Sequence, residues 1–137
     1  GPMLSGAIKQ LMDSTEWGDL DYLFIDMPPG TGDAYLTVAK DLKPDSAILV
    51  TTESPLAVQD TLKSKILFQK LNIPILGYIN NMVSSSSSGG GTEGDITNIL
   101  GLDLLGSIPM DDDVANFNLI GSAKLFESTY NNLKIII

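Results

Sequence analysis

The most constraining feature of this chain is an apolar run that ends in one carboxylate and leads directly into a rigid turn. Residues 22–25 read Tyr-Leu-Phe-Ile, Asp26 follows, and residues 27–33 read Met-Pro-Pro-Gly-Thr-Gly-Asp. A short continuous apolar run is typical of a strand that is buried in a parallel sheet. We therefore predict a strand over residues 21–26, with Asp26 at the carboxyl end, where α/β sheets bind their ligands.

This segment is compatible with two interpretations. In nucleotide hydrolases an acid at such a position holds Mg²⁺, and a glycine-rich turn behind it directs backbone N–H groups at phosphate. An acid before a Pro-Gly turn is also common as a helix cap or a turn former. The segment by itself leaves both interpretations open.

Apolar periodicity along the rest of the chain predicts strands that alternate with helices. Further strands are expected at residues 46–52, 74–80 and 104–108. Helices are expected within residues 1–17, 33–41, 54–71 and 123–137, and a short one from Thr92, with Pro55 at a first helical position. The alternation predicts one α/β domain over residues 1–137, with a mostly parallel sheet of about four strands and helices on both faces.

Composition excludes several kinds of chemistry. The 137 residues contain no cysteine and no histidine, and all 8 basic residues are lysines. Disulfides, Cys/His zinc sites and histidine acid–base catalysis are therefore excluded for this chain. The net charge of −9 argues against nucleic-acid binding. No signal peptide or membrane-spanning run is recognisable, so we expect a cytoplasmic protein without membrane contact.

Two polar segments have ordinary explanations. Residues 84–91 read Ser-Ser-Ser-Ser-Ser-Gly-Gly-Gly, a composition that predicts a flexible loop. Serine hydroxyls can bind phosphate, but a mobile run of this kind is not preorganised for it. Residues 111–113 are three successive aspartates, which are either a metal cluster or, more commonly, the charge set at a helix N-terminus.

Several motifs in order carry a family resemblance. They are Gly-Pro-Met-Leu-Ser-Gly-Ala at residues 1–7, Trp-Gly-Asp-Leu-Asp-Tyr-Leu at 17–23, Asp-Met-Pro-Pro-Gly-Thr-Gly-Asp at 26–33, Val-Thr-Thr at 50–52 and Asn-Asn-Met at 80–82. Together they resemble the Mrp/ApbC family of ATP-binding iron–sulfur cluster carriers, which are related to MinD and ParA. The resemblance implies a partial doubly wound fold of the SIMIBI-type P-loop NTPase kind.

On the phosphate side, the resemblance implies a role for each residue of the Asp-x-Pro-Pro-Gly string. Asp26 corresponds to the Walker B acid, which holds Mg²⁺ through water. Gly30, after Pro28 and Pro29, corresponds to the switch turn whose backbone approaches the terminal phosphate.

On the base side, the resemblance implies contacts from two chain segments. Asn81 corresponds to the asparagine that contacts adenine, and an asparagine side chain offers the donor and the acceptor that an adenine edge needs. An asparagine after a strand is also commonly a turn residue. Pro109, Met110 and Asp111 fall where the family closes the other side of the base.

The chain departs from the family in two places. No glycine-rich loop that ends in Lys-Ser or Lys-Thr is present, although such a loop carries most of the phosphate binding in these proteins. The Cys-x-x-Cys expected after the Asn-Met turn is replaced by the Ser/Gly run. A serine hydroxyl does not substitute as a cluster ligand, because its alkoxide is far too basic at neutral pH and too hard for iron–sulfur chemistry.

These departures predict that the isolated chain is catalytically inactive, although its relatives are implied to use ATP and Mg²⁺ and to carry an iron–sulfur cluster. A homodimer or a complementing upstream segment is then expected, with iron–sulfur recipient proteins as further partners. Two alternatives stay open: a nucleotide-incompetent interaction module, and a MinD/ParA-like positioning ATPase. Without a neighbouring strand, residues 21–26 are also expected to destabilise the chain, to pair elsewhere or to regroup.

Overall fold

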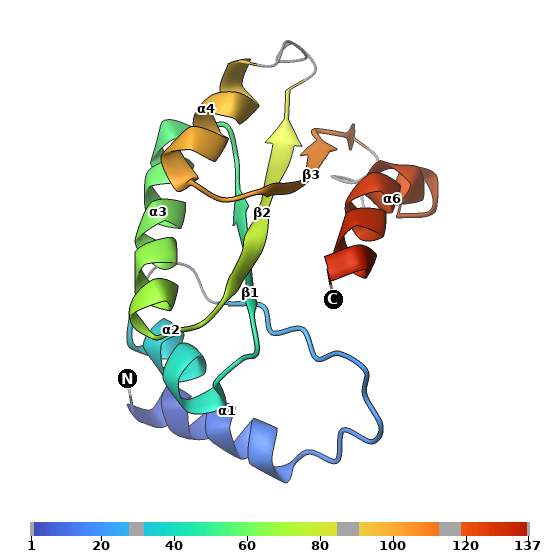
Figure 1. The fold of residues 1–137 in the computed structure, drawn as a ribbon. Coiled ribbons are helices and arrows are strands. Elements are labelled where there is room, and N and C mark those ends of the chain that lie inside the picture. The colour runs from blue at the N-terminus through green and yellow to red at the C-terminus, as the bar shows by residue number, and fades with distance from the viewer. Residues whose placement is uncertain (1, 28–31, 85–90, 113–118, 137) are drawn as a thin grey trace.

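Three parallel strands form the centre of the protein. The computed structural model describes residues 2–27, 32–84, 91–112 and 119–136. β1 (Ala47–Thr51), β2 (Ile75–Val83) and β3 (Leu104–Pro109) lie in the order β1-β2-β3, and both neighbouring pairs are parallel (Figure 1). The predicted α/β class with a parallel sheet is confirmed.

Helices cover the sheet from two sides. α3 (Pro55–Lys70) connects β1 to β2, α4 (Gly91–Leu100) precedes β3, and α3 packs on α4 and on β1. α6 (Leu119–Ile136) packs against β3 on the other side of the sheet, as Figure 1 shows. α1 (Pro2–Ser14) packs on the short α2 (Asp33–Thr37) and on the π-helical turn η1 (Val38–Leu42), below the amino end of β1. The expected helices on both faces are therefore present.

The core lies between the sheet and α3 and α4. Tyr78 of β2 is completely buried there, and its hydroxyl lies 2.8 Å from Thr97 Oγ1 of α4. The rings of Tyr35 and Phe68 meet with their centroids 5.5 Å apart, which joins α2 to α3. The buried cluster comprises Tyr35, Ala39, Leu49, Val58, Phe68, Ile73, Tyr78, Ile96 and Leu100. These apolar residues come from α2, η1, β1, α3, β2 and α4 and from the turn before β2, and Leu104 of β3 packs against them.

The strand predicted over residues 21–26 is not formed. The segment runs without regular structure, and its apolar side chains are exposed: Leu20, Tyr22, Leu23 and Phe24, the last at 71%. Tyr22 and Phe24 contact each other, with ring centroids 6.5 Å apart. A strand is stabilised by its ladder with a neighbour, and none of the described strands pairs with this segment. The sheet therefore has three strands rather than about four.

Local signals place the other elements to within a few residues. Pro55 begins α3 as expected, but the Ser54 side chain makes no capping hydrogen bond. α4 begins at Gly91, one residue before the predicted start, and β2 extends to Val83, beyond the predicted end. Most of the predicted flexible loop, residues 85–90, lies outside the described residues, as does most of the segment that follows Asp112.

Candidate functional site

The carboxyl ends of β2 and β3 bring the predicted base-side residues together. Val83 is the register partner of Pro109, and the Met110 N–H donates a hydrogen bond to the Val83 carbonyl at 2.9 Å. This pairing places Asn81, near the end of β2, beside the Pro109–Met110 segment on the neighbouring strand. Parallel pairing thus brings together residues that are separated in the sequence by a loop and the helix α4.

Asn81 is oriented by a local hydrogen bond. Its Oδ1 accepts the Met82 N–H at 3.0 Å, and Met82 has the left-handed backbone conformation with φ +55°. Because the backbone N–H needs an acceptor, the amide oxygen of Asn81 and not its nitrogen faces Met82. A carbonyl oxygen has two lone pairs, so Oδ1 retains one acceptor site, and Nδ2 donates to no described residue. The half-buried side chain thus keeps both functions that an adenine edge requires.

Two exposed methionines lie at the same ends of β2 and β3 as Asn81. Met110 is 69% exposed, and Met82 is exposed as well. Thioether side chains are adaptable and make favourable contacts with aromatic rings. An amide with a donor and an acceptor and exposed thioether side chains at one sheet edge are the residue types that a flat heteroaromatic base would require.

A further hydrogen bond ties β2 to the loop after β1 at the same edge. The Ser84 N–H donates to a Glu53 carboxylate oxygen at 3.3 Å. The edge is thus built from the ends of all three strands, as expected for a ligand-binding edge in an α/β sheet.

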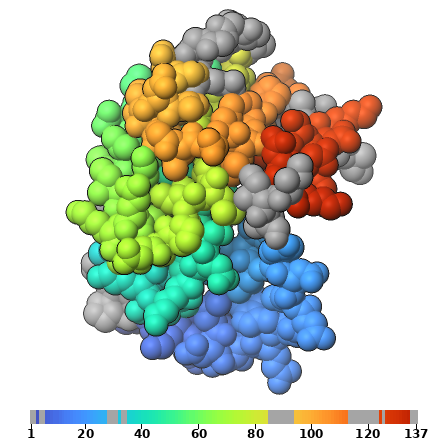
Figure 2. Space-filling model, viewed as in Figure 1, coloured from blue at the N-terminus to red at the C-terminus, as the bar shows by residue number. Residues whose placement is uncertain are grey.

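Asp26 is not joined to this group by any described element. Its side chain is exposed on the irregular segment, which passes the lower half of the sheet in Figure 1, whereas β2 ends at the top. Figure 2 shows the same segment on the lower right of the surface, next to α1. The predicted Pro28, Pro29 and Gly30 lie outside the described residues.

Asp26 suits Mg²⁺ as a type of ligand, but the described residues around it do not form a metal site. A carboxylate is a hard oxygen ligand of the kind that Mg²⁺ takes, normally together with water and substrate phosphates. In the described part of the chain, no group of three acidic, histidine or cysteine side chains is arranged to hold a metal ion. Asp26 could therefore serve only as one ligand, in an arrangement completed by phosphate and water.

Asn80 was not singled out from the sequence. It is completely buried, it is the register partner of Thr51, and neither atom of its amide has a hydrogen-bond partner among the described residues. The available signal was an amide residue inside an otherwise apolar strand. A buried amide without partners is destabilising, which marks this end of the sheet as a place where polarity is kept at a cost in stability.

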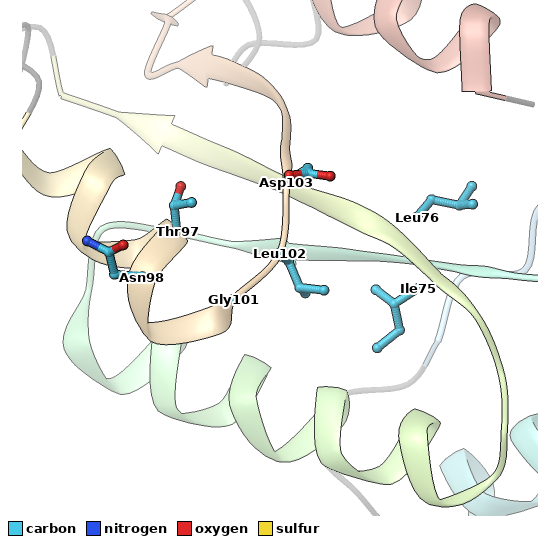
Figure 3. A pocket seen from close by; sticks show the side chains of 7 residues that line it. All are labelled: Ile75, Leu76, Thr97, Asn98, Gly101, Leu102 and Asp103. Carbon is cyan, nitrogen blue, oxygen red and sulfur yellow. The ribbon is translucent and has the colours of Figure 1, made fainter.

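A shallow groove of about 380 Å³ lies at the opposite end of the sheet. Figure 3 shows its lining, which comes from the start of β2, the end of α4 and the turn before β3. The lining residues are Ile75, Leu76, Thr97, Asn98, Gly101, Leu102 and Asp103. None of the predicted site residues lines this groove, and it lies at the amino ends of the strands, away from the edge where α/β sheets bind ligands.

The parallel sheet with helices on both faces defines an α/β class of protein. A family model described as ParA, NUBPL iron-transfer P-loop NTPase, matches residues 1–134. The chain belongs to this family, and the resemblance to the iron–sulfur cluster carriers is confirmed.

Curated relatives and solved structures agree with this assignment. The chain is 41% identical over 124 residues to an iron–sulfur cluster carrier protein of Aquifex aeolicus, a match that covers 84% of this chain and 34% of the relative. It is similar to the cell division ATPase MinD of Pyrococcus furiosus, with a TM-score of 0.71, 23% identity and coverage of 98% of this chain and 58% of that chain. The MinD likeness shows the fold alone.

A third comparison concerns a nucleotide complex. A nucleotide-binding protein of Archaeoglobus fulgidus, solved in complex with ADP, is 28% identical with a TM-score of 0.66, over 95% of this chain and 53% of that chain. The match covers 34% of the length of the Aquifex aeolicus carrier and 42% of that of the Pseudomonas fragi and Methanocaldococcus jannaschii carriers. Among the described helices, none has both the length and the apolar character needed to cross a bilayer.

Proposed function

We propose that this chain contributes the adenine-binding side and the magnesium-directing carboxylate of an ATP-dependent iron–sulfur cluster carrier. The observation that carries the proposal is the strand-end group of Asn81, Pro109 and Met110, held together by the Met110–Val83 hydrogen bond. Membership of the iron-transfer P-loop NTPase family supports the same assignment.

In this proposal each residue has a limited task. The Asn81 amide donates to a ring nitrogen of adenine and accepts from its amino group, while Pro109, Met110 and Asp111 close the other side of the base. Bound Mg²⁺ would neutralise charge that develops on the transferred phosphate. Asp26 would hold the water shell of that ion, and Gly30, after Pro28 and Pro29, would present its backbone N–H toward the phosphate.

The phosphate loop and the cluster ligands must come from elsewhere in this proposal. The sequence has no glycine-rich loop that ends in Lys-Ser or Lys-Thr, and it has no cysteine. A complementing segment would supply the phosphate loop, a second copy of the chain would complete a homodimer, and an iron–sulfur protein would receive the cluster. The chain by itself is then expected to show no ATPase activity. The same absences favour the second candidate, an interaction module that binds partners without nucleotide.

A covalent chimaera tests the adenine-binding role. The matched region of the Aquifex aeolicus carrier is replaced by this chain, so that the rest of the relative is supplied in the same polypeptide. Titration calorimetry with Mg·ATP is expected to show that Asn81→Ala raises the Kd about tenfold, the effect of about 1.4 kcal/mol.

Asn98→Ala serves as the matched control, because Asn98 is an exposed asparagine on α4 beside the groove at the other end of the sheet. Its Kd is expected to equal that of the unsubstituted chimaera. Equal affinities for the Asn81 and Asn98 variants would remove the adenine-binding role. A folded chimaera that does not bind Mg·ATP would favour the interaction module instead.

A further inference from the structure

A carboxylate lies at the carboxyl end of β1, next to the proposed base site. Glu53 follows the end of β1 by two residues, and its side chain is half-buried. Its Oε2 accepts the Ser84 N–H at 3.3 Å, directly after the end of β2. Because this bond joins residues 31 positions apart in sequence, it places the carboxylate beside the strand that carries Asn81.

The turn after β1 leaves the sheet at the level of the base site. Thr51 is the register partner of Asn80, so the residues that follow Thr51 lie at the level of the residues that follow Asn80. The Ser54 N–H donates to Thr52 Oγ1 at 3.3 Å, and α3 begins one residue later. Glu53 therefore lies in a short turn that is held at both ends.

The order of the strands determines which part of a nucleotide can reach Glu53. In the proposed function the base lies at the ends of β2 and β3, and Pro109, Met110 and Asp111 close it on the β3 side. The sugar then leaves the base on the other side, toward β1, whose axis lies about 4.8 Å from that of β2. Glu53 stands at the strand end that the sugar reaches.

The chemistry of a carboxylate suits the hydroxyl groups of a ribose. An ionised carboxylate only accepts hydrogen bonds, and its two oxygens offer about four acceptor positions, so the Ser84 N–H uses only part of this capacity. Sugar hydroxyls are donors, and hydrogen bonds to a carboxylate are roughly twice as strong as neutral ones. Phosphate, in contrast, is repelled by a carboxylate. In dinucleotide-binding α/β folds an acidic side chain holds the ribose hydroxyl in the same way.

The competing explanation is that Glu53 only fastens the turn after β1 to the end of β2. Loss of a purely structural bond of this kind would weaken the binding of every nucleotide alike, whatever its sugar. A direct contact with the ribose would instead change the ratio between the affinities for nucleotides that differ only in their sugar hydroxyls.

We infer that the Glu53 carboxylate binds the ribose hydroxyls of the nucleotide and distinguishes ribonucleotides from deoxyribonucleotides. The inference rests on the proposed function, because it requires that the base lies beside Asn81. Glu53 is a binding residue in this arrangement and takes no part in the chemistry at the phosphate.

Titration calorimetry of the covalent chimaera with Mg·ATP, Mg·dATP and the magnesium complex of 3′-deoxy-ATP tests the inference. The weaker of the two deoxynucleotides is expected to have a Kd about tenfold above that of ATP. Glu53→Ala should reduce this difference to within about twofold, because it weakens the binding of ATP much more than that of the deoxynucleotide. Glu53→Gln can still accept the Ser84 N–H but has no charge, so a difference of about threefold is expected.

Asp103→Ala is the control, because this carboxylate lies at the opposite end of the same sheet, in the groove at the amino ends of the strands. It should leave the ratio between ATP and the deoxynucleotides unchanged. The inference alone is overturned if the chimaera binds all three nucleotides equally, or if Glu53→Ala weakens them by the same factor. A folded chimaera that binds none of them overturns the proposed function, and this inference with it.

Discussion

The two strand-like regions of the chain, residues 20–26 and β2, have similar local sequences and very different structures. Both are short apolar runs, but β2 has neighbours on both edges and buries Tyr78 completely. Residues 20–26 have no ladder partner among the described strands, and Phe24 is largely exposed. The comparison shows that an apolar run becomes a strand only where its hydrogen-bonding neighbours are available.

The same difference divides the candidate site. On the base side, β2 and β3 pair and bring Asn81 beside Pro109 and Met110. On the proposed phosphate side, Asp26 lies in residues 20–26, which are outside the sheet. No described strand positions its carboxylate at the carboxyl ends of β2 and β3. The proposed base side therefore rests on a strand pairing that the structure describes, whereas the proposed phosphate side has no such pairing among the described residues.

Truncating an aromatic side chain in each region is expected to give the largest contrast. Tyr78→Ala should lower the free energy of unfolding by about 3–5 kcal/mol, because it leaves a cavity in the core and removes the hydrogen bond with Thr97. Phe24→Ala should change it by less than about 0.5 kcal/mol. Urea unfolding followed by circular dichroism measures both. Similar losses for the two variants would break the comparison, because they would show that residues 20–26 are packed in solution.

If Tyr78→Ala does not fold, Tyr78→Phe supplies the same test at smaller amplitude. It removes only the hydroxyl that pairs with Thr97 Oγ1, at a cost of about 0.5–1.5 kcal/mol.

Replacing the buried amide of Asn80 is expected to have an intermediate effect of opposite sign. Asn80→Leu should raise the free energy of unfolding by about 1 kcal/mol, because it removes a buried amide without hydrogen-bond partners. Asn98→Leu, at an exposed position on α4, should stay within about 0.5 kcal/mol of the unsubstituted chain. A marked fall in the free energy of unfolding for Asn80→Leu would mean that the amide forms hydrogen bonds in solution. The polar residue at this strand end would then not destabilise the protein.

The smallest effect is expected at high pH. Burial raises the pKa of Tyr35 above its ordinary value of 10.0, and a side-chain hydrogen bond with Ser64 offsets part of the rise. Above pH 10 the folded state therefore holds this proton more tightly than the unfolded chain, so the free energy of unfolding falls as the pH rises.

Tyr35→Phe should flatten that part of the dependence, whereas Tyr130→Phe, at an exposed position on α6, should leave it unchanged. Urea unfolding between pH 9 and pH 11, a range of about one unit on either side of the ordinary tyrosine pKa, measures the difference. An identical slope for Tyr35→Phe would show that α2, directly after the unpaired segment, is not packed on α3 in solution.

Local sequence determined most of the regular elements of this protein. The apolar runs at β1, β2 and β3 predicted their strands, and Pro55 predicted the start of α3, because burial and backbone geometry act within a few residues. The motif around Asp26 and the Asn-Asn-Met turn predicted the family, which the comparisons confirmed. The roles of Asn81, Pro109, Met110 and Asp111 remain predictions.

Only the tertiary structure decided which of the apolar runs became strands and which polar residues met. Residues 21–26 have the composition of a strand, but a ladder needs a partner that local sequence does not reveal, and here the segment lies outside the sheet. The meeting of Asn81 with Pro109 depends on the parallel pairing of β2 with β3, a contact between distant parts of the chain. Composition sets which residues avoid water, whereas pairing and register set which of them become neighbours.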